Sequence, residues 1–322
     1  MIEVKNLTKR YGDNLAVNDL SFTVEKGRIY GFLGPNGAGK STTMNIITGC
    51  LAATSGTVII NGHDIFEEPV EAKKCIGYLP EQPPLYMDMT PKEYLRFVAQ
   101  AKGISHKEMT AQLNTVMNKT RIVDVQDRLI RNLSKGYKQR VGIAQALLGN
   151  PEVIILDEPT VGLDPAQIIE IRELIRELGK EHTLVLSSHI LSEVQAVCDS
   201  IMIISKGKLV ASDTPENLTT LFAGTTTLKL EIRAEEENVR SILSTLEGVE
   251  DFTVSRSEND TVLAEIKPDE ECDIREALFL AFARAEAPIL EMSRIKASLE
   301  DVFLELTQGE AVRPEAKEDE SK

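Results

Sequence analysis

The stretch from Gly34 to Thr42, GPNGAGKST, constrains this chain more than any other part of it. It matches the phosphate-binding pattern G-x-x-x-x-G-K-[ST], with Gly34, Gly39, Lys40 and Ser41 at the fixed positions. Glycine lets the backbone turn tightly, so that successive N–H groups can point inward at phosphate oxygens. We expect Lys40 to reach the β- and γ-phosphates and the Ser41 hydroxyl to bind Mg²⁺.

The residues on either side of this loop fit a nucleotide site. An apolar run from Ile29 to Leu33 precedes it, as a buried strand should, and Ser41 to Thr48 read as a helix that Gly49 ends. The N-terminus of that helix would face the anion. We therefore predict that the whole loop binds the nucleotide: Gly34, Pro35, Asn36, Gly37, Ala38, Gly39, Lys40, Ser41 and Thr42.

An aromatic residue near the N-terminus offers a contact for the base. Tyr11 lies between predicted strands at Ile2–Leu7 and Asp19–Val24. A ring on such a short loop could stack against a purine, although a lone tyrosine is more often only half-buried. A further strand is predicted at Thr57–Ile60, followed by a turn at Asn61–Gly62.

The composition limits the class of protein and its partners. The 322 residues suffice for one large domain and a small one. A net charge of -15 argues against a surface that neutralises nucleic-acid phosphates. The four cysteines form no C-x-x-C pair, which favours the reduced thiols of a cytosolic protein. Because no apolar run is long enough to cross a bilayer, we expect a peripheral protein that reaches the cytoplasmic face of the membrane through a partner.

An apolar run in the middle of the chain ends in two carboxylates. Val153 to Leu156 read as a buried strand, with Asp157 and Glu158 at its C-terminal end. Such a pair suits a nucleotide site in an open α/β sheet. Because side chains alternate along a strand, we expect the acids to differ in role. Asp157 would belong to the Mg²⁺ shell, while Glu158 would face the γ-phosphate and polarise the attacking water.

Two further polar side chains are candidates for the same nucleotide site. Thr183–Leu186 is a second predicted core strand, and His189 follows it. A lone histidine is more often structural, but one at the end of a core strand could contact the γ-phosphate. Gln82 lies in a proline-rich loop after a short strand and is able to ligate Mg²⁺ and to orient a water. A lone glutamine in a polar loop is usually only solvated.

The motifs, and their order along the chain, resemble those of the ATP-binding subunits of ABC transporters. After the phosphate loop come Gln82 as the Q-loop, LSKGYKQR as the signature, VIILDEP as the second nucleotide motif, GLDP as the D-loop and His189 as the switch histidine. The resemblance covers about the first two-thirds of the chain. It implies the α/β P-loop NTPase fold of an ABC ATPase, with ATP and Mg²⁺ as cofactors. The implied catalytic residues are Glu158, His189, Gln82 and Lys40, and the implied metal ligands are Ser41, Gln82 and Asp157.

The resemblance also implies a composite site. Two such subunits, here a homodimer, would pair head to tail and sandwich two ATP molecules. Ser134 and Gly136 of one subunit would then touch the γ-phosphate bound by the other, and the predicted helix that begins at Ser134 would direct its amides and dipole to the anion. The chain departs from the usual LSGGQ at Lys135, where lysine replaces glycine, and at Tyr137, where tyrosine replaces glutamine.

The last third of the chain reads as a separate small domain. Strands and helices are predicted in the order β-α-β-β-α-β, which indicates a ferredoxin-like α+β domain. The hairpin turn falls at Glu258-Asn259-Asp260, and Ser298 to Thr307 read as a closing amphipathic helix. That domain and helix resemble those of ATPases of the ABC-2 exporter group, which serve drug efflux, sodium efflux and gliding motility.

These patterns predict an order of domains and a function. We expect an ATP-binding domain over residues 1–222 with a helical insertion at about 88–145, an accessory domain over 226–307 and a disordered tail over 308–322. The expected function is ATP hydrolysis that powers transport, in particular export, through a separate membrane permease and without nucleic acid. The alternatives are a soluble ABC ATPase acting on nucleic acid or the ribosome, and an importer ATPase whose C-terminal domain binds an effector.

Overall fold

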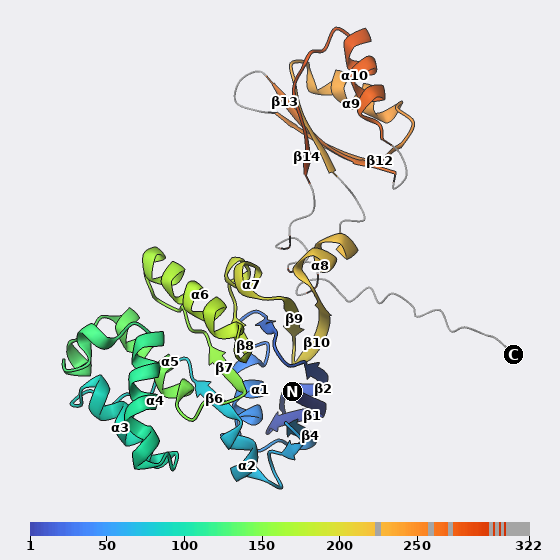
Figure 1. Cartoon of the computed structure of the whole chain (residues 1–322). Coiled ribbons are helices and arrows are strands. Elements are labelled where there is room, and N and C mark those ends of the chain that lie inside the picture. The colour runs from blue at the N-terminus through green and yellow to red at the C-terminus, as the bar shows by residue number, and fades with distance from the viewer. Residues whose placement is uncertain are drawn as a thin grey trace, which may run out of the picture. The chain divides into compact units, whose positions relative to one another are not determined.

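The computed structural model describes residues 1–222, 227–256, 261–269 and 273–295, together with 299, 303 and 306. The described chain divides into two compact units, Met1–Pro215 and Glu216–Glu305, and Leu306 belongs with the first. The predicted first domain extends further, to residue 222 at the end of α8 (Pro215–Phe222). Figure 1 shows the elements of both units, each of which is described by itself below.

A four-stranded antiparallel sheet opens the first unit. Its order is β2-β1-β4-β5, and the strands are β1 (Ile2–Tyr11), β2 (Asn14–Val24), β4 (Ser55–Ile60) and β5 (His63–Asp64). The three predicted strands are present and longer than predicted. The predicted turn joins β4 to β5, where Asn61 and Gly62 have φ values of 51° and 90°.

A six-stranded sheet carries the nucleotide motifs. Its order is β10-β9-β3-β8-β7-β6, and all neighbouring strands run parallel except β10. The strands are β3 (Ile29–Leu33), β6 (Ile76–Leu79), β7 (Val153–Asp157), β8 (Thr183–Ser188), β9 (Ser200–Ser205) and β10 (Lys208–Asp213). Every residue of β3, β7, β8 and β9 is buried, as expected for a parallel sheet with both faces covered. The carboxyl ends of parallel strands share one edge, so the motifs that follow these strands meet there.

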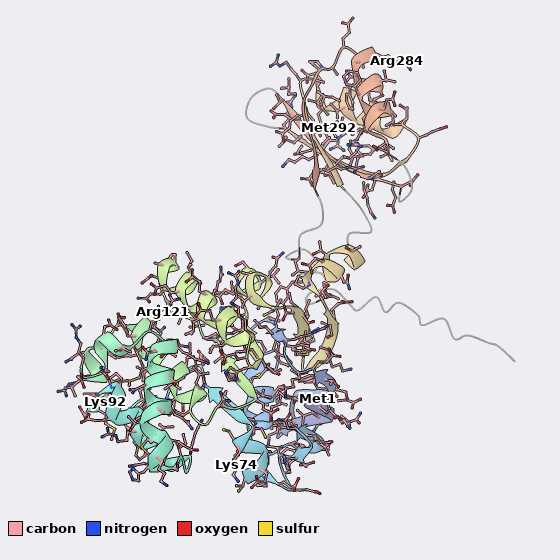
Figure 2. All side chains as sticks on the ribbon, in the orientation of Figure 1. Met1, Lys74, Lys92, Arg121, Arg284 and Met292 are labelled. Carbon is pink, nitrogen blue, oxygen red and sulfur yellow. The ribbon has the colours of Figure 1, made fainter. Side chains whose placement is uncertain are left out.

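Helices cover this sheet, and a helical segment extends from it. The covering helices are α1 (Lys40–Ile47), α2 (Pro69–Lys74), α6 (Pro165–Gly179) and α7 (Leu191–Val197). The helical segment lies in the predicted insertion and contains α3 (Pro91–Ala101), α4 (His106–Lys119), 3-10 turns at Val123–Val125 and Ile130–Asn132, and α5 (Lys135–Leu147). Figure 1 shows α3, α4 and α5 gathered beside the sheets, and Figure 2 shows Lys92 and Arg121 on their surface.

The second unit has the predicted ferredoxin-like topology. Its elements are β11 (Thr227–Ile232), α9 (Glu236–Ser244), β12 (Val249–Arg256), β13 (Val262–Pro268), α10 (Arg275–Arg284) and β14 (Ile289–Ile295). The antiparallel sheet has the order β12-β13-β11-β14. Alternate residues of β11, Leu228, Leu230 and Ile232, are buried against the helices. The predicted hairpin turn, most of the closing helix and the predicted tail lie outside the described residues.

Candidate nucleotide-binding site

A cavity of about 660 Å³ opens beside the phosphate loop. It collects side chains from widely separated parts of the sequence, some that follow strands of the six-stranded sheet and some from the ends of β1 and β2 in the four-stranded sheet. The lining comprises Tyr11, Asn14, Leu15, Ala16, Asn36, Gly37, Gly39, Lys40, Ser41, Thr42, Glu81, Glu158, Val161, His189 and Lys206. Most of the predicted site residues are among them.

The phosphate loop holds a backbone shape that needs glycine. Gly39 has a φ of 105°, and a Cβ built there would lie 2.5 Å from the Ala16 carbonyl oxygen. A Cβ on Gly34 would lie equally close, 2.5 Å, to the carbonyl oxygen of Ile204. No side chain caps the N-terminus of α1, so its first N–H groups are available to an anion.

Lys40 is buried at the start of α1 and points back into the loop. Its ammonium donates to the carbonyl oxygens of Gly34 and Pro35, at 2.8 and 3.3 Å, and lies 3.8 Å from a carboxylate oxygen of Glu158. Burial lowers the pKa of Lys40, and the nearby charges of Glu158, Asp157 and Glu81 oppose that shift. The amine therefore lies among acceptors that a phosphate could replace.

The two acids at the end of β7 have different surroundings. Asp157 is buried, accepts a short hydrogen bond from the Ser187 hydroxyl and is absent from the cavity lining. Glu158 has a left-handed backbone with a φ of 49°, which is uncommon for a residue other than glycine. The Ser187 carbonyl and hydroxyl oxygens accept from its N–H, at 3.2 and 3.1 Å, and the turn directs the carboxylate into the cavity.

His189 lies directly against Glu158. Its Nδ1 is 2.9 Å from both carboxylate oxygens, and 38% of its side chain is exposed. Hydrogen bonds hold the residue before it in place. The hydroxyls of Ser188 and Thr160 both donate to the buried carboxylate of Glu193, at 3.1 and 2.5 Å. Lys40, Glu158 and His189 thus form one continuous chain of polar contacts.

The structure departs from the sequence interpretation at Gln82. Gln82 is exposed and does not line the cavity, whereas its neighbour Glu81 does. The strand β6 ends at Leu79, and the following residues turn so that Glu81 faces the site. Sequence reasoning missed Glu81 because glutamine is the residue type that the family pattern leads one to seek. Tyr11 does line the cavity, and the Lys9 ammonium lies 5.1 Å from the centre of its ring.

Ser134 and Gly136 lie in a different cavity, of about 520 Å³. Ser134 is the N-cap of α5 and accepts from the Tyr137 N–H at 3.4 Å. The Tyr137 hydroxyl donates to Asp124 at 2.7 Å, so this departure from the family pattern is tied to the helical segment. Within one copy of the chain, these signature residues do not join the phosphate loop.

The residues at the main cavity suit a magnesium ion held together with a nucleotide. Among the described residues, no group of three or more histidine, cysteine or acidic side chains could hold a metal by itself. Mg²⁺ typically takes one or two carboxylates along with substrate phosphates and water. The Ser41 hydroxyl, at the edge of the cavity, and the Asp157 carboxylate behind it supply oxygen ligands of that kind. The donor set therefore fits the ion.

Known proteins resemble this chain, some of them over nearly its whole length. The family model described as ABC transporter matches residues 17–161. The uncharacterized ABC transporter ATP-binding protein YhcH of Bacillus subtilis is 36% identical over 95% of this chain and 96% of its own length. The linearmycin resistance ATP-binding protein LnrL of the same organism is 32% identical over 95% of this chain and 98% of its own length.

Solved structures agree with the fold. The dimeric bacterial ABC transporter cassette MJ0796 is 27% identical over 66% of this chain and 98% of its own, with a TM-score of 0.61. The same cassette has a structure in a post-hydrolysis state bound to ADP and Pi, which matches with a TM-score of 0.60. In the described part of the present chain, no helix has the length and apolarity that crossing a bilayer requires. The chain therefore belongs to the ATP-binding proteins of ABC transporters, and its enzymatic activity is ATP hydrolysis.

Proposed function

We propose that this protein hydrolyses Mg²⁺-bound ATP at the interface of a homodimer and thereby powers export through a separate membrane permease. The observation that carries the proposal is the contact chain from Lys40 through Glu158 to His189 inside one cavity. It supports the proposal because a cation able to bind phosphates, a carboxylate able to accept a proton from water and a histidine in contact with that carboxylate lie together.

The contacts among Lys40, Glu158 and His189 suggest how a bound triphosphate would change the site. Lys40 is paired with loop carbonyls and lies near Glu158. A γ-phosphate would offer it stronger, charge-assisted hydrogen bonds and would separate it from Glu158. The Glu158 carboxylate, still held by His189, would then accept a proton from the attacking water. Bound Mg²⁺ would neutralise phosphate charge, with Ser41 and Asp157 as its ligands.

The separation of the two cavities supports a dimer as the active form. Ser134 and Gly136 cannot complete the site of their own copy, because they line a different cavity. A second copy placed head to tail would bring the α5 N-terminus, with its N-cap serine, to the γ-phosphate. The cassette MJ0796, a relative of this fold, is dimeric.

A surface patch after Glu81 fits contact with a permease. Tyr86, Met87 and Phe97 are exposed there, and a contiguous group of exposed apolar side chains commonly marks an interaction site. The Tyr86 ring packs edge to face on Phe97, with centroids 5.4 Å apart, so the patch is preformed. Because the patch begins shortly after Glu81, movement there can reach the nucleotide cavity through a short segment. We place the permease contact on this patch.

Export is the direction that the relatives favour. The relative LnrL is a linearmycin resistance protein by its name, and it matches the chain throughout, C-terminal unit included. The net charge of -15 weighs against the alternative of a nucleic-acid ATPase.

Membrane fractionation tests the proposal. Co-expressed with its permease, the wild-type protein should sediment with membranes, and without a permease it should stay in the supernatant. A double variant, Tyr86→Ser with Phe97→Ser, should remain in the supernatant while its ATPase activity persists. Sedimentation that does not depend on a permease, or that survives both substitutions, would contradict the assignment of the surface.

A further inference from the structure

We propose that the protein has a second binding site, for a single-ring phenol, in a cavity beside His182. The cavity has a volume of about 250 Å³ and lies between α4, the end of α5 and the residue that precedes β8. None of its lining residues lines the nucleotide cavity, so the inference does not depend on the proposed function. The lining includes Ala111, Gln112, Val116, Leu147, Asn150 and His182.

The cavity lies at the far end of β8 from the nucleotide site. β8 starts directly after His182 and ends directly before His189, which lines the nucleotide cavity. Its six residues span about 20 Å in extended form. A molecule beside His182 would therefore occupy a site of its own, apart from the nucleotide.

The imidazole of His182 has one nitrogen with a partner and one without. Its Nδ1 lies 2.8 Å from the carbonyl oxygen of Pro151, and because a carbonyl can only accept, Nδ1 holds the proton. In the neutral ring, Nε2 is then a hydrogen-bond acceptor. His182 is only 4% exposed, and within the described residues its buried Nε2 makes no hydrogen bond.

The contact at Nδ1 also sets the direction of the free acceptor. The two nitrogens of an imidazole point to different sides of the ring, so Nε2 is directed away from Pro151. His182 lines the cavity together with α4, and a donor held between them would supply the missing hydrogen bond. Leaving a buried acceptor unpaired costs free energy, so pairing it would stabilise the complex.

The remaining walls indicate a neutral ring that carries a hydroxyl. Ala111, Val116 and Leu147 offer apolar surface, and a cavity of roughly 150 Å³ suffices for benzene, so this one accommodates a ring with one substituent. Lys119, which also lines the cavity, is already paired with Glu181 at 2.7 Å, so a charged ligand has no free counter-ion there in the described part of the chain.

Gln112 favours a hydroxyl over other donors. Its Oε1 accepts from the Gly149 N–H at 3.1 Å, so its NH₂ group is the end that can donate to an occupant. A hydroxyl donates one hydrogen bond and accepts others, and therefore suits both the acceptor of His182 and the donor of Gln112.

The test observes His182 directly. Phenol is titrated into the intact protein labelled with ¹⁵N-histidine, without nucleotide, and the imidazole nitrogens are followed by NMR. The chain has four histidines, and the variants His63→Gln, His106→Gln and His189→Gln assign the other three signals while His182 stays in place. Anisole is the matched ligand, because it keeps the ring and the oxygen but lacks the O–H.

The two ligands should give different results. We expect phenol to shift the His182 Nε2 resonance saturably, with half-saturation at about 1 mM or below, as is ordinary for a ligand of about seven non-hydrogen atoms. Anisole should bind about 5–10-fold more weakly, because it cannot make the hydrogen bond to Nε2. The absence of a saturable shift with phenol would mean that water alone satisfies Nε2 and would overturn the proposal, as would an equal response to anisole.

Filling the cavity checks where the phenol binds. Ala111→Trp introduces a large side chain at the lining from an exposed position of α4, whereas Asn114→Trp adds the same side chain to the same helix outside the lining. The His182 response to phenol should be lost in the first variant and kept in the second. A response that survives Ala111→Trp would contradict the proposed location. The comparison of phenol with anisole uses the wild type, so it decides the proposal even if Ala111→Trp fails to fold.

Discussion

At the scale of residues, the nucleotide cavity is built from side chains that follow the ends of β6, β7 and β8, and two of them, Glu158 and His189, are in direct contact. The sequence predicted a difference between Asp157 and Glu158 from the alternation of side chains along a strand, but β7 ends at Asp157 and a left-handed turn directs Glu158 into the cavity. The loop that holds Gln82 has no such period, since its prolines impose turns that sequence alone does not locate to one residue. The contact between His189 and Glu158 could not be predicted from the sequence either, because it joins the ends of two different strands.

Replacing the carboxylate at Glu158 should separate binding from chemistry. Glu158→Gln keeps the shape of the side chain but removes the proton acceptor. We expect ATP binding to persist and turnover to fall by about 10²–10⁴-fold, the usual contribution of one general base. Steady-state hydrolysis and fluorescence binding of an ATP analogue check the two parts. Normal turnover in this variant would move the base elsewhere.

Gly136 should be sensitive to charge more than to size. A Cβ there would lie 2.8 Å from the end of the Gln167 side chain, which is free to move aside. We therefore expect Gly136→Ala to retain substantial ATPase activity. Gly136→Asp should abolish hydrolysis and leave ATP binding largely intact, because a carboxylate would face the partner's γ-phosphate. Hydrolysis by Gly136→Asp would argue against the composite site.

At the scale of elements, apolar runs in the sequence predicted the core strands, but the sequence did not indicate the breaks between helices in the helical segment. The predicted helical insertion at about 88–145 carried no internal boundaries, whereas α3 ends at Ala101 and α4 starts at His106. Gly103, with a φ of 74°, turns the chain between them. The periodicity of apolar residues continues across the break, because both helices bury the same kind of face. The pattern therefore could not show where one helix stops.

The start of α3 provides a prediction for the effect of pH on stability. The backbone N–H of Thr90 and its hydroxyl both donate to the Glu93 carboxylate, at 2.9 and 3.0 Å. These hydrogen bonds, the backbone one first, hold the pKa of Glu93 below its ordinary value. The folded protein therefore binds fewer protons here than the unfolded chain. The stabilisation is present above the unfolded pKa and is lost as pH falls through the folded pKa.

Replacing Glu93 should make the free energy of unfolding depend less steeply on pH in the acid range. We expect Glu93→Gln to lower the free energy of unfolding at neutral pH and to make it fall less steeply toward acid pH than in the wild type. Urea unfolding between neutral and acid pH measures this, with Glu108→Gln, in the first turn of α4, as a control. Equal slopes for the wild type and Glu93→Gln would mean that the hydrogen bonds from Thr90 to Glu93 do not contribute.

At the scale of the whole molecule, topology supports the proposal that one chain is insufficient for hydrolysis. The order of strands brings the phosphate loop, the acid pair and the histidine to one edge of a sheet, whereas α5 belongs to the helical segment. The sequence predicted both the α/β fold and the ferredoxin-like unit from their patterns of strands and helices. The separation of the two cavities followed only from the family resemblance, since the pattern of strands and helices does not show how α5 packs.

The central claim is that the phosphate loop of one copy meets the signature of another around ATP. The substitutions Asn36→Cys and Lys135→Cys, both at exposed positions, in a protein freed of its native cysteines, test it most directly. In a Glu158→Gln background with ATP, mild oxidation should join two copies through disulfides between these positions, and ADP should reduce the yield. If no disulfide-linked dimer forms, with or without nucleotide, the account of the site is contradicted.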